Sequence, residues 1–337
     1  MALKPPVEVP QGAIRLNTDS QKLEFFAQDQ WWQMATDVSD SLGGRGLYAG
    51  GWPNNGTRID MITISTQGNA IDFGTLTTGR YEGGALGSRI RGYWGADGIG
   101  SSSAQSIDTV SFGSGGSASD FGDLTQLRQT PAGGANSTRG LFAGGYAPSP
   151  TQWVTTIDYI TLTSTGTAKD FGDIQQRTNG ASCSFSPTRG VMTLGANQPS
   201  TSSYNGIDFV TISTTGNAQD FGDSTVGHKA RGSASSATRG VWSAGHLSTN
   251  NIDYVTYATT GNATDFGDLT RTTSYMMFSA STCIRGTFGA GGFPSHTNNI
   301  DYITIATQGD AIDFGDMTHT AALIMIGNCS NAHGGLG

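Results

Sequence analysis

The chain has 337 residues, of which 50 are glycine, and a formal net charge of −8. Its lysines and arginines form no basic cluster, which argues against a nucleic-acid partner, and no stretch reaches about 18 consecutive apolar residues, which argues against membrane insertion. The start of the chain lacks the apolar core of a secretory signal peptide, so we expect the protein to be made in a cytoplasm without export through a membrane.

Residues 1–36 predict an N-terminal arm that carries a small β-sheet. The segments AIRLN, KLEFFA and WWQM are short and rich in apolar and aromatic residues, and TDSQ separates the first two. This pattern indicates a three-stranded β-meander. Pro5, Pro6 and Pro10 favour an extended start that can dock onto a partner. The residues that we expect to anchor the arm are Ile14, Leu23, Phe25, Trp31 and Trp32.

Residues 37–337 contain three short motifs that recur together. Arg-Gly supplies Arg45, Arg91, Arg139, Arg189, Arg239 and Arg285. Ile-Asp begins at Ile59, Ile107, Ile157, Ile207, Ile252 and Ile300. Asp-Phe-Gly supplies Asp72, Asp120, Asp170, Asp220, Asp265 and Asp313. Six copies at steps of 45 to 50 residues indicate a repeat architecture with a period of about 48 residues.

Each repeat predicts four β-strands. RGLFAGG is a short apolar run, IDYITLT is rich in β-branched residues, TSTGTA turns the chain, and Asp-Phe-Gly lies in a further short strand. A single sheet of this kind cannot bury its own faces, whereas six sheets around an axis can. We therefore predict an all-β fold, a six-bladed β-propeller that resembles kelch-type propellers. Residues 321–331 are in phase with the strand that precedes Arg-Gly, and we expect them to close the first blade.

The repeated aspartates have two interpretations. DFGD places two carboxylates three residues apart in a turn, which could bind calcium, although the first copy reads DFGT. The structural interpretation, which we favour, is that these aspartates cap turns or pair with the equally repeated arginines. The five histidines show no metal-binding spacing. We expect neither a metal site nor a cofactor.

The candidate binding residues lie in the loops between the Arg-Gly and Ile-Asp strands. These loops differ in length and mix Asn, Ser and Thr with isolated aromatic residues, a composition suited to reading sugars or proteins. Because all six join the same two strands, we expect them to emerge on one face of the ring. The candidate ligand-binding residues are Trp52, Tyr146, Trp153, Tyr204, His246, Phe293 and His296.

An enzymatic role is not favoured by the repeated residues. DFGDLT weakly resembles the Asp-box turn of six-bladed sialidases, whose catalytic apparatus includes a glutamate that partners a tyrosine nucleophile. Here glutamate occurs only at Glu8, Glu24 and Glu82. A residue repeated six times is also typical of a scaffold. We therefore assign no catalytic residue.

Two resemblances suggest where this protein is used. GAIRLNT, LEFF and WW resemble the small β-hairpin of tailed-phage fibre proteins, and RGLFAGG, IDYITI and TGNATDFGDLT resemble repeats in structural proteins of marine phages, notably those that infect cyanobacteria. They imply a virion protein in a tail fibre or similar appendage, joined to other virion proteins by its N-terminal arm, whose propeller recognises a host surface glycan or protein. A homo-oligomer is compatible with this role.

Two alternatives stay open. The first is a capsid decoration or head-fibre protein without specific receptor binding, which would use the same fold. The second is a tailspike-like enzyme that degrades glycans, in which paired aspartates would act as the catalytic carboxylates.

Overall fold

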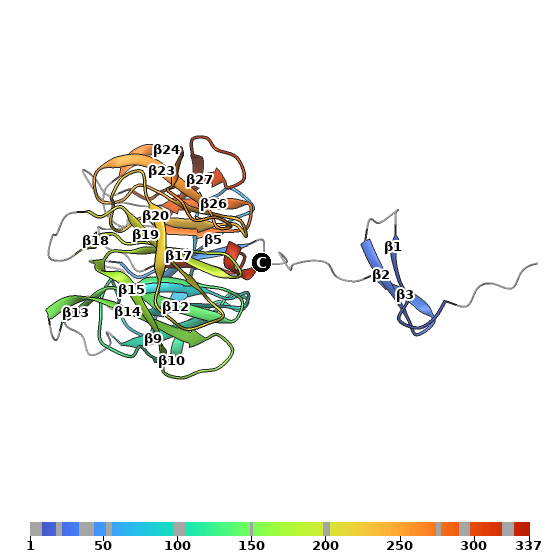
Figure 1. Cartoon of the computed structure of the whole chain (residues 1–337). Coiled ribbons are helices and arrows are strands. Elements are labelled where there is room, and N and C mark those ends of the chain that lie inside the picture. The colour runs from blue at the N-terminus through green and yellow to red at the C-terminus, as the bar shows by residue number, and fades with distance from the viewer. Residues whose placement is uncertain are drawn as a thin grey trace, which may run out of the picture. The chain divides into compact units, whose positions relative to one another are not determined.

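The computed structural model describes residues 9–17, 22–33, 44–51, 56–96, 105–148, 151–197, 203–273, 278–289, 297–318 and 327–337. Within these residues the secondary structure is all-β apart from one short 3₁₀ helix, η1 (Gly334–Leu336). This confirms the predicted all-β class. The chain divides into two compact units, Met1–Leu42 and Gly43–Gly337, both drawn in Figure 1.

The N-terminal unit is a three-stranded antiparallel meander. Its strands β1 (Ile14–Asn17), β2 (Lys22–Ala27) and β3 (Gln30–Gln33) pair in chain order. Gln28 and Asp29, between β2 and β3, both have positive φ angles, 52° and 61°. This is the conformation of the two-residue hairpin turn whose twist matches that of the strands it joins.

The larger unit contains a series of antiparallel sheets, here numbered in chain order with their strands in hydrogen-bonded sequence. Sheet I comprises β29 (Asn328–Ser330), β4 (Arg45–Ala49), β5 (Arg58–Thr63) and β6 (Ile71–Thr75). Sheet II comprises β7 (Gly84–Gly87), β8 (Arg91–Gly95), β9 (Ser106–Ser111) and β10 (Ser119–Asp123). Sheet III comprises β11 (Ala132–Ala135), β12 (Arg139–Ala143), β14 (Thr151–Thr161), β15 (Lys169–Asn179) and β18 (Ala196–Asn197), and β13 (Tyr146–Pro148) pairs with β14.

The remaining sheets repeat this plan. Sheet IV comprises β16 (Ser182–Phe185), β17 (Arg189–Thr193), β19 (Gly206–Thr211) and β20 (Gln219–Asp223). Sheet V comprises β21 (Ser233–Ser235), β22 (Arg239–Trp242), β23 (Thr249–Thr256) and β24 (Thr264–Thr273). Sheet VI comprises β25 (Phe278–Ser281), β26 (Arg285–Gly289), β27 (Asn299–Thr304) and β28 (Ile312–Asp316).

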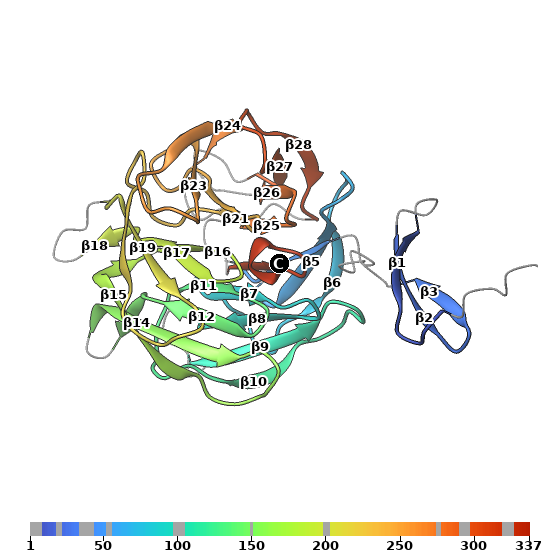
Figure 2. The same cartoon turned by 45° about the vertical axis from the view of Figure 1, so that its right-hand side comes forward.

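The first strands of these sheets contact one another in a cycle. Among the described strands the order is β29, β7, β11, β16, β21, β25 and again β29. Figure 2 shows the sheets arranged around η1 and the C-terminus. The arrangement is propeller-like, and each sheet buries its faces against its two neighbours.

Sheet I joins the two ends of the repeated region. Its strand β29 comes from the C-terminal end of the chain and pairs antiparallel with β4, with Cys329 opposite Leu47. Because the first and last strands of the repeated region pair in one sheet, the repeats form a closed series without unpaired terminal sheet edges. Residues 321–326 of the predicted closing segment lie outside the described residues.

A backbone contact between consecutive sheets explains why Asp-Phe-Gly and a glycine-containing turn recur together. The Gly166 N–H of sheet III donates to the carbonyl oxygen of Phe121 in sheet II at 3.0 Å. The same bond joins sheet VI to sheet I, where the Gly68 N–H donates to the Phe314 carbonyl oxygen at 3.0 Å. A Cβ on Gly122 would lie only 2.3 Å from the Gly166 carbonyl oxygen. The motif therefore needs glycine for close backbone approach.

The predicted pairing of the Arg-Gly arginines with the Asp-Phe-Gly aspartates is wrong. Most of these arginines donate instead to a backbone carbonyl oxygen in the next sheet, as Arg139 does to Ile212 at 2.8 Å and Arg239 to Ile305 at 3.1 Å. The Arg239 guanidinium also lies 4.9 Å from the ring centre of Tyr254 in its own sheet. The six Asp-Phe-Gly aspartates are exposed on the outer strands, so water solvates their charge.

The aspartates that the fold buries are those of Ile-Asp. Asp108 in sheet II accepts a hydrogen bond from the Thr77 hydroxyl at 2.7 Å and forms an ion pair with Arg80 at 2.9 Å. Asp158 in sheet III has the same two kinds of partner, Thr125 and Arg128, at 2.6 and 2.7 Å. These partners precede the sheet in the chain, so each buried pair joins consecutive sheets. The carboxylate is buried but its charge is compensated.

Asp208 in sheet IV lacks the threonine and arginine partners that Asp108 and Asp158 have. It is 2% exposed like its equivalents, but Gln175 and Thr178 occupy the places of the threonine and the arginine. The Gln175 backbone N–H donates to its carboxylate at 2.8 Å. Burial, together with the charge of Asp220, raises the pKa of Asp208 to about 6, against the lowering effect of the Gln175 hydrogen bond.

Candidate functional site

The strand ends that the variable loops join lie at the same end of the larger unit as the entrance to the ring axis. Successive connections of an antiparallel sheet alternate between its two ends. The loops that join the Arg-Gly and Ile-Asp strands therefore share one end with the connections that enter each first strand. We call this end the loop face. The helix η1 lies at the other end, where the His333 ring lies 2.9 Å from the Gly87 carbonyl oxygen, and Figure 1 shows η1 opposite β13 and β18.

Two predicted binding residues, Tyr146 and Trp153, come together on the loop face. They are direct cross-strand partners in the hairpin that β13 and β14 form, and both side chains are partly exposed. Directly opposed residues of an antiparallel pair point to the same side of the sheet, so the two rings share one surface. Of the other candidates, Trp52, Phe293 and His296 lie outside the described residues.

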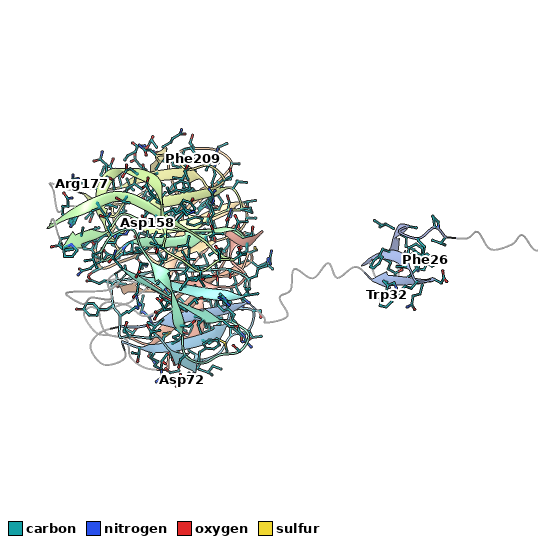
Figure 3. All side chains as sticks on the ribbon, turned by 90° about the horizontal axis from the view of Figure 1, so that it is seen from below. Phe26, Trp32, Asp72, Asp158, Arg177 and Phe209 are labelled. Carbon is teal, nitrogen blue, oxygen red and sulfur yellow. The ribbon has the colours of Figure 1, made fainter. Side chains whose placement is uncertain are left out.

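The strands beneath this hairpin hold it in place. Strands β14 and β15 each have 11 residues, whereas β19 and β20 in sheet IV have 6 and 5. Across them, Arg177 Nη1 donates to Gln152 Oε1 at 2.7 Å and the Thr155 hydroxyl donates to Asp173 at 2.7 Å. At its end β15 pairs with β18, which belongs to the next variable loop. The hairpin therefore continues regular sheet structure, and Figure 3 labels Arg177.

Tyr204 has a more structural position than its loop suggested. Its side chain is partly buried and packs against the apolar cluster that sheets III and IV share. Its backbone N–H donates to the Gly195 carbonyl oxygen at 2.7 Å. Burial first, then Asp223 and Asp208, raise the pKa of its hydroxyl, which stays protonated at neutral pH.

His246 lies beside a second histidine that sequence analysis did not select. The His246 backbone N–H donates to the Lys229 carbonyl oxygen at 3.3 Å, and burial followed by the Lys229 charge lowers the pKa of its ring. His228 is buried, and its Nε2 lies 3.2 Å from Asn251 Oδ1. Burial followed by Arg231 lowers the pKa of His228 to about 4, so this ring is neutral near pH 7.

A cavity of about 90 Å³ opens on the loop face at the axis, lined by the beginnings of the first strands. Its rim includes Glu82, Thr130, Gly180 and Ala230, which all have φ angles between 51° and 71°. Burial raises the pKa of Glu82, and the charge of Lys229 opposes this effect. The four rim positions recur at the repeat spacing but differ in chemistry, so no motif marked them in the sequence.

The structure offers no group of three His, Cys, Asp or Glu side chains suited to a metal ion among the residues it describes. The carboxylates of the DFGD motifs, in particular, point outward on separate sheets. Within the same residues, no helix is long and apolar enough to cross a membrane.

Comparison with known proteins gives the fold alone. No protein-family model and no curated protein sequence matches this chain. Among solved structures, the chain is similar to that of YjhT, with a TM-score of 0.59 and 9% sequence identity over 73% of this chain and 86% of the other. At this identity the likeness supports a propeller-like architecture and says nothing about activity.

Proposed function

We propose that this chain is a non-enzymatic tailed-phage virion protein, a six-bladed kelch-like propeller in a tail fibre or similar appendage, whose loop face binds the host surface. The cyclic contacts of the first strands and the bonds between sheets VI and I support six blades. The virion assignment rests on the sequence resemblance to phage proteins. The N-terminal unit would join the propeller to other virion proteins.

The observation that carries the binding function is the pair Tyr146 and Trp153 on the extended sheet III hairpin. The repeated residues are used to join one sheet to the next, so the chemistry that differs between repeats lies on the loop face. Gln152 precedes Trp153 in β14 and so points to the other side of the sheet, where its amide accepts from Arg177. Two aromatic rings on one surface suit the face of a sugar or a polar protein surface.

The test is binding of fluorescently labelled protein to a panel of marine cyanobacterial strains. The test variant carries Tyr146→Ser and Trp153→Ser. The matched control carries Ile90→Ser and Ile284→Ser, which remove two exposed apolar side chains, 69% and 70% exposed, from the opposite end of the ring. We expect saturable binding by the wild type and the control to at least one strain, with at least a tenfold loss for the test variant.

Three results would overturn this proposal. Equal binding by the test variant and the control would move the binding surface away from the hairpin. Absence of binding to every strain, with the protein found on the capsid shell, would favour the decoration role. Release of reducing ends from host polysaccharide by the purified protein would favour the enzyme.

A further inference from the structure

One face of the N-terminal sheet carries an exposed apolar row. Ile14 on β1 lies directly opposite Phe25 on β2, and Phe25 lies directly opposite Trp32 on β3. Directly opposed residues point to the same side of the sheet, so the three side chains form one continuous row across the strands. Within their unit they are 64%, 37% and 44% exposed. The Trp32 indole N–H donates to the Ala27 carbonyl oxygen at 2.9 Å, which fixes this ring on the row.

The other face of the same sheet is internally satisfied. There the Arg15 guanidinium forms an ion pair with Glu24 at 2.8 Å and stacks 4.1 Å from the ring centre of Trp31. Trp31 in turn packs edge-on against Phe26. Glu24 is only 5% exposed. Of the predicted anchoring residues, Trp31 therefore serves the sheet itself, whereas Ile14, Phe25 and Trp32 present exposed surface. The side chain of Leu23 lies outside the described part of the chain.

A sheet this small has little core of its own. Three strands of four to six residues need a covered apolar face for independent stability. The unit is compact by itself. The row of Ile14, Phe25 and Trp32 is the apolar face that a partner would cover.

The composition of the row favours a second copy of itself. When two such faces meet around a two-fold axis along β2, Phe25 meets Phe25 and each Ile14 meets the Trp32 of the other copy. An isoleucine with a tryptophan occupies about the same thickness as two phenylalanines, so the two sheets stay evenly spaced and well packed. No charge lies in the row. Such a contact is self-complementary, as a two-fold interface requires.

We propose that the N-terminal sheets of two copies of this chain pair face to face through Ile14, Phe25 and Trp32. Three side chains a copy make a contact well below the standard interface of about 800 Å² per partner, so the pairing is weak in solution and depends on concentration. The pairing is independent of what the loop face binds.

The first test is sedimentation velocity of the full chain from about 1 to about 200 µM, the range in which an interface of this size associates. Ile14→Glu places a charge in the row and is tolerated by the single copy because the side chain is 64% exposed. Ile71→Glu, at a site 56% exposed on β6, is the matched control. We expect the wild type and the control to dimerise alike, and Ile14→Glu to shift dimerisation to at least tenfold higher concentration.

The second test reads the geometry of the pair with a short bismaleimide cross-linker in a Cys283→Ser background, because Cys283 is an exposed thiol. Phe25→Cys should cross-link to itself. Ile14→Cys and Trp32→Cys should cross-link to each other in a mixture more efficiently than either does alone. A monomer at all concentrations, equal effects of the two glutamate variants, or cross-linking without this preference would overturn the proposal.

Discussion

The Thr318 hydroxyl donates to the Asp60 carboxylate at 2.6 Å, although 258 residues separate the two in the chain. Within sheets I and II the equivalent bond, Thr77 to Asp108, spans only 31 residues. Asp60 lies in sheet I and Thr318 follows sheet VI, so the threonine–aspartate bond that links most consecutive sheets also links the last sheet to the first. The repeated residues therefore serve the contacts between sheets.

Asp208→Asn should stabilise the protein at alkaline pH. The folded-state pKa of Asp208 is raised to about 6 from an ordinary value of 3.8, so the fold favours the protonated form and the stability it contributes is lost as pH rises through this window. Asparagine removes the buried charge and keeps an acceptor for the Gln175 N–H. We expect a gain of about 1–3 kcal/mol at pH 8 that shrinks below pH 5, measured by urea unfolding at both pH values. A loss of stability at pH 8 would contradict this account.

Arg128→Ala should have the opposite effect at the equivalent site in sheet III. Asp158 is fully buried and would keep its Thr125 hydrogen bond but lose its ion pair at 2.7 Å. Removal of one partner of a buried pair leaves an uncompensated charge, which costs about 3–5 kcal/mol. Urea unfolding at pH 7 measures the loss, and the double variant Arg128→Ala with Asp158→Asn should recover part of it.

Gly122→Ala should destabilise more than Gly166→Ala. Both glycines have φ angles that disfavour alanine, 151° and 142°. Only at Gly122 would the new Cβ meet a backbone oxygen, 2.3 Å away, since nothing lies within 4 Å of a Cβ on Gly166. The backbone strain is thus matched, and the difference in unfolding free energy measures the contact between sheets. We expect the two losses of unfolding free energy to differ by about 2 kcal/mol or more. Equal losses would show that the sheets can move apart at Gly122 without a cost in stability.

Arg239→Ala should lower the melting temperature, whereas Asp265→Ala should leave it nearly unchanged. Arg239 donates to the carbonyl oxygens of Ile305 and Ala306 at 3.1 and 2.9 Å and stacks on Tyr254. Asp265 is exposed on β24. We expect about 1–2 kcal/mol for the arginine and less than about 0.5 kcal/mol for the aspartate. If the two variants lost equal unfolding free energy and the double variant lost no more than either, the ion pair predicted from the sequence would be supported instead.

The candidate site could be predicted in outline from the loops whose sequences differ between the repeats. Tyr146 and Trp153 stand out because they interrupt a loop that the scaffold does not constrain, and the structure does bring them together. Tyr204 stands out equally in the sequence but packs against the core between sheets III and IV. Loop composition does not reveal this difference, because burial depends on the neighbouring sheet.

The sequence by itself determined the period, the four strands of each repeat and the glycine-marked turns, because hydrophobic alternation and glycine conformations are local properties. Tertiary structure alone decided which repeated residues meet. In every repeat, the sequence spacing from the Arg-Gly arginine to the Ile-Asp aspartate and to the Asp-Phe-Gly aspartate is similar. The spacing alone therefore cannot tell whether the arginine contacts a residue of its own sheet or of the next one. The twist and packing of consecutive sheets place the arginine on a carbonyl of its neighbour, bury Asp108 and its equivalents, and leave the Asp-Phe-Gly carboxylates in water.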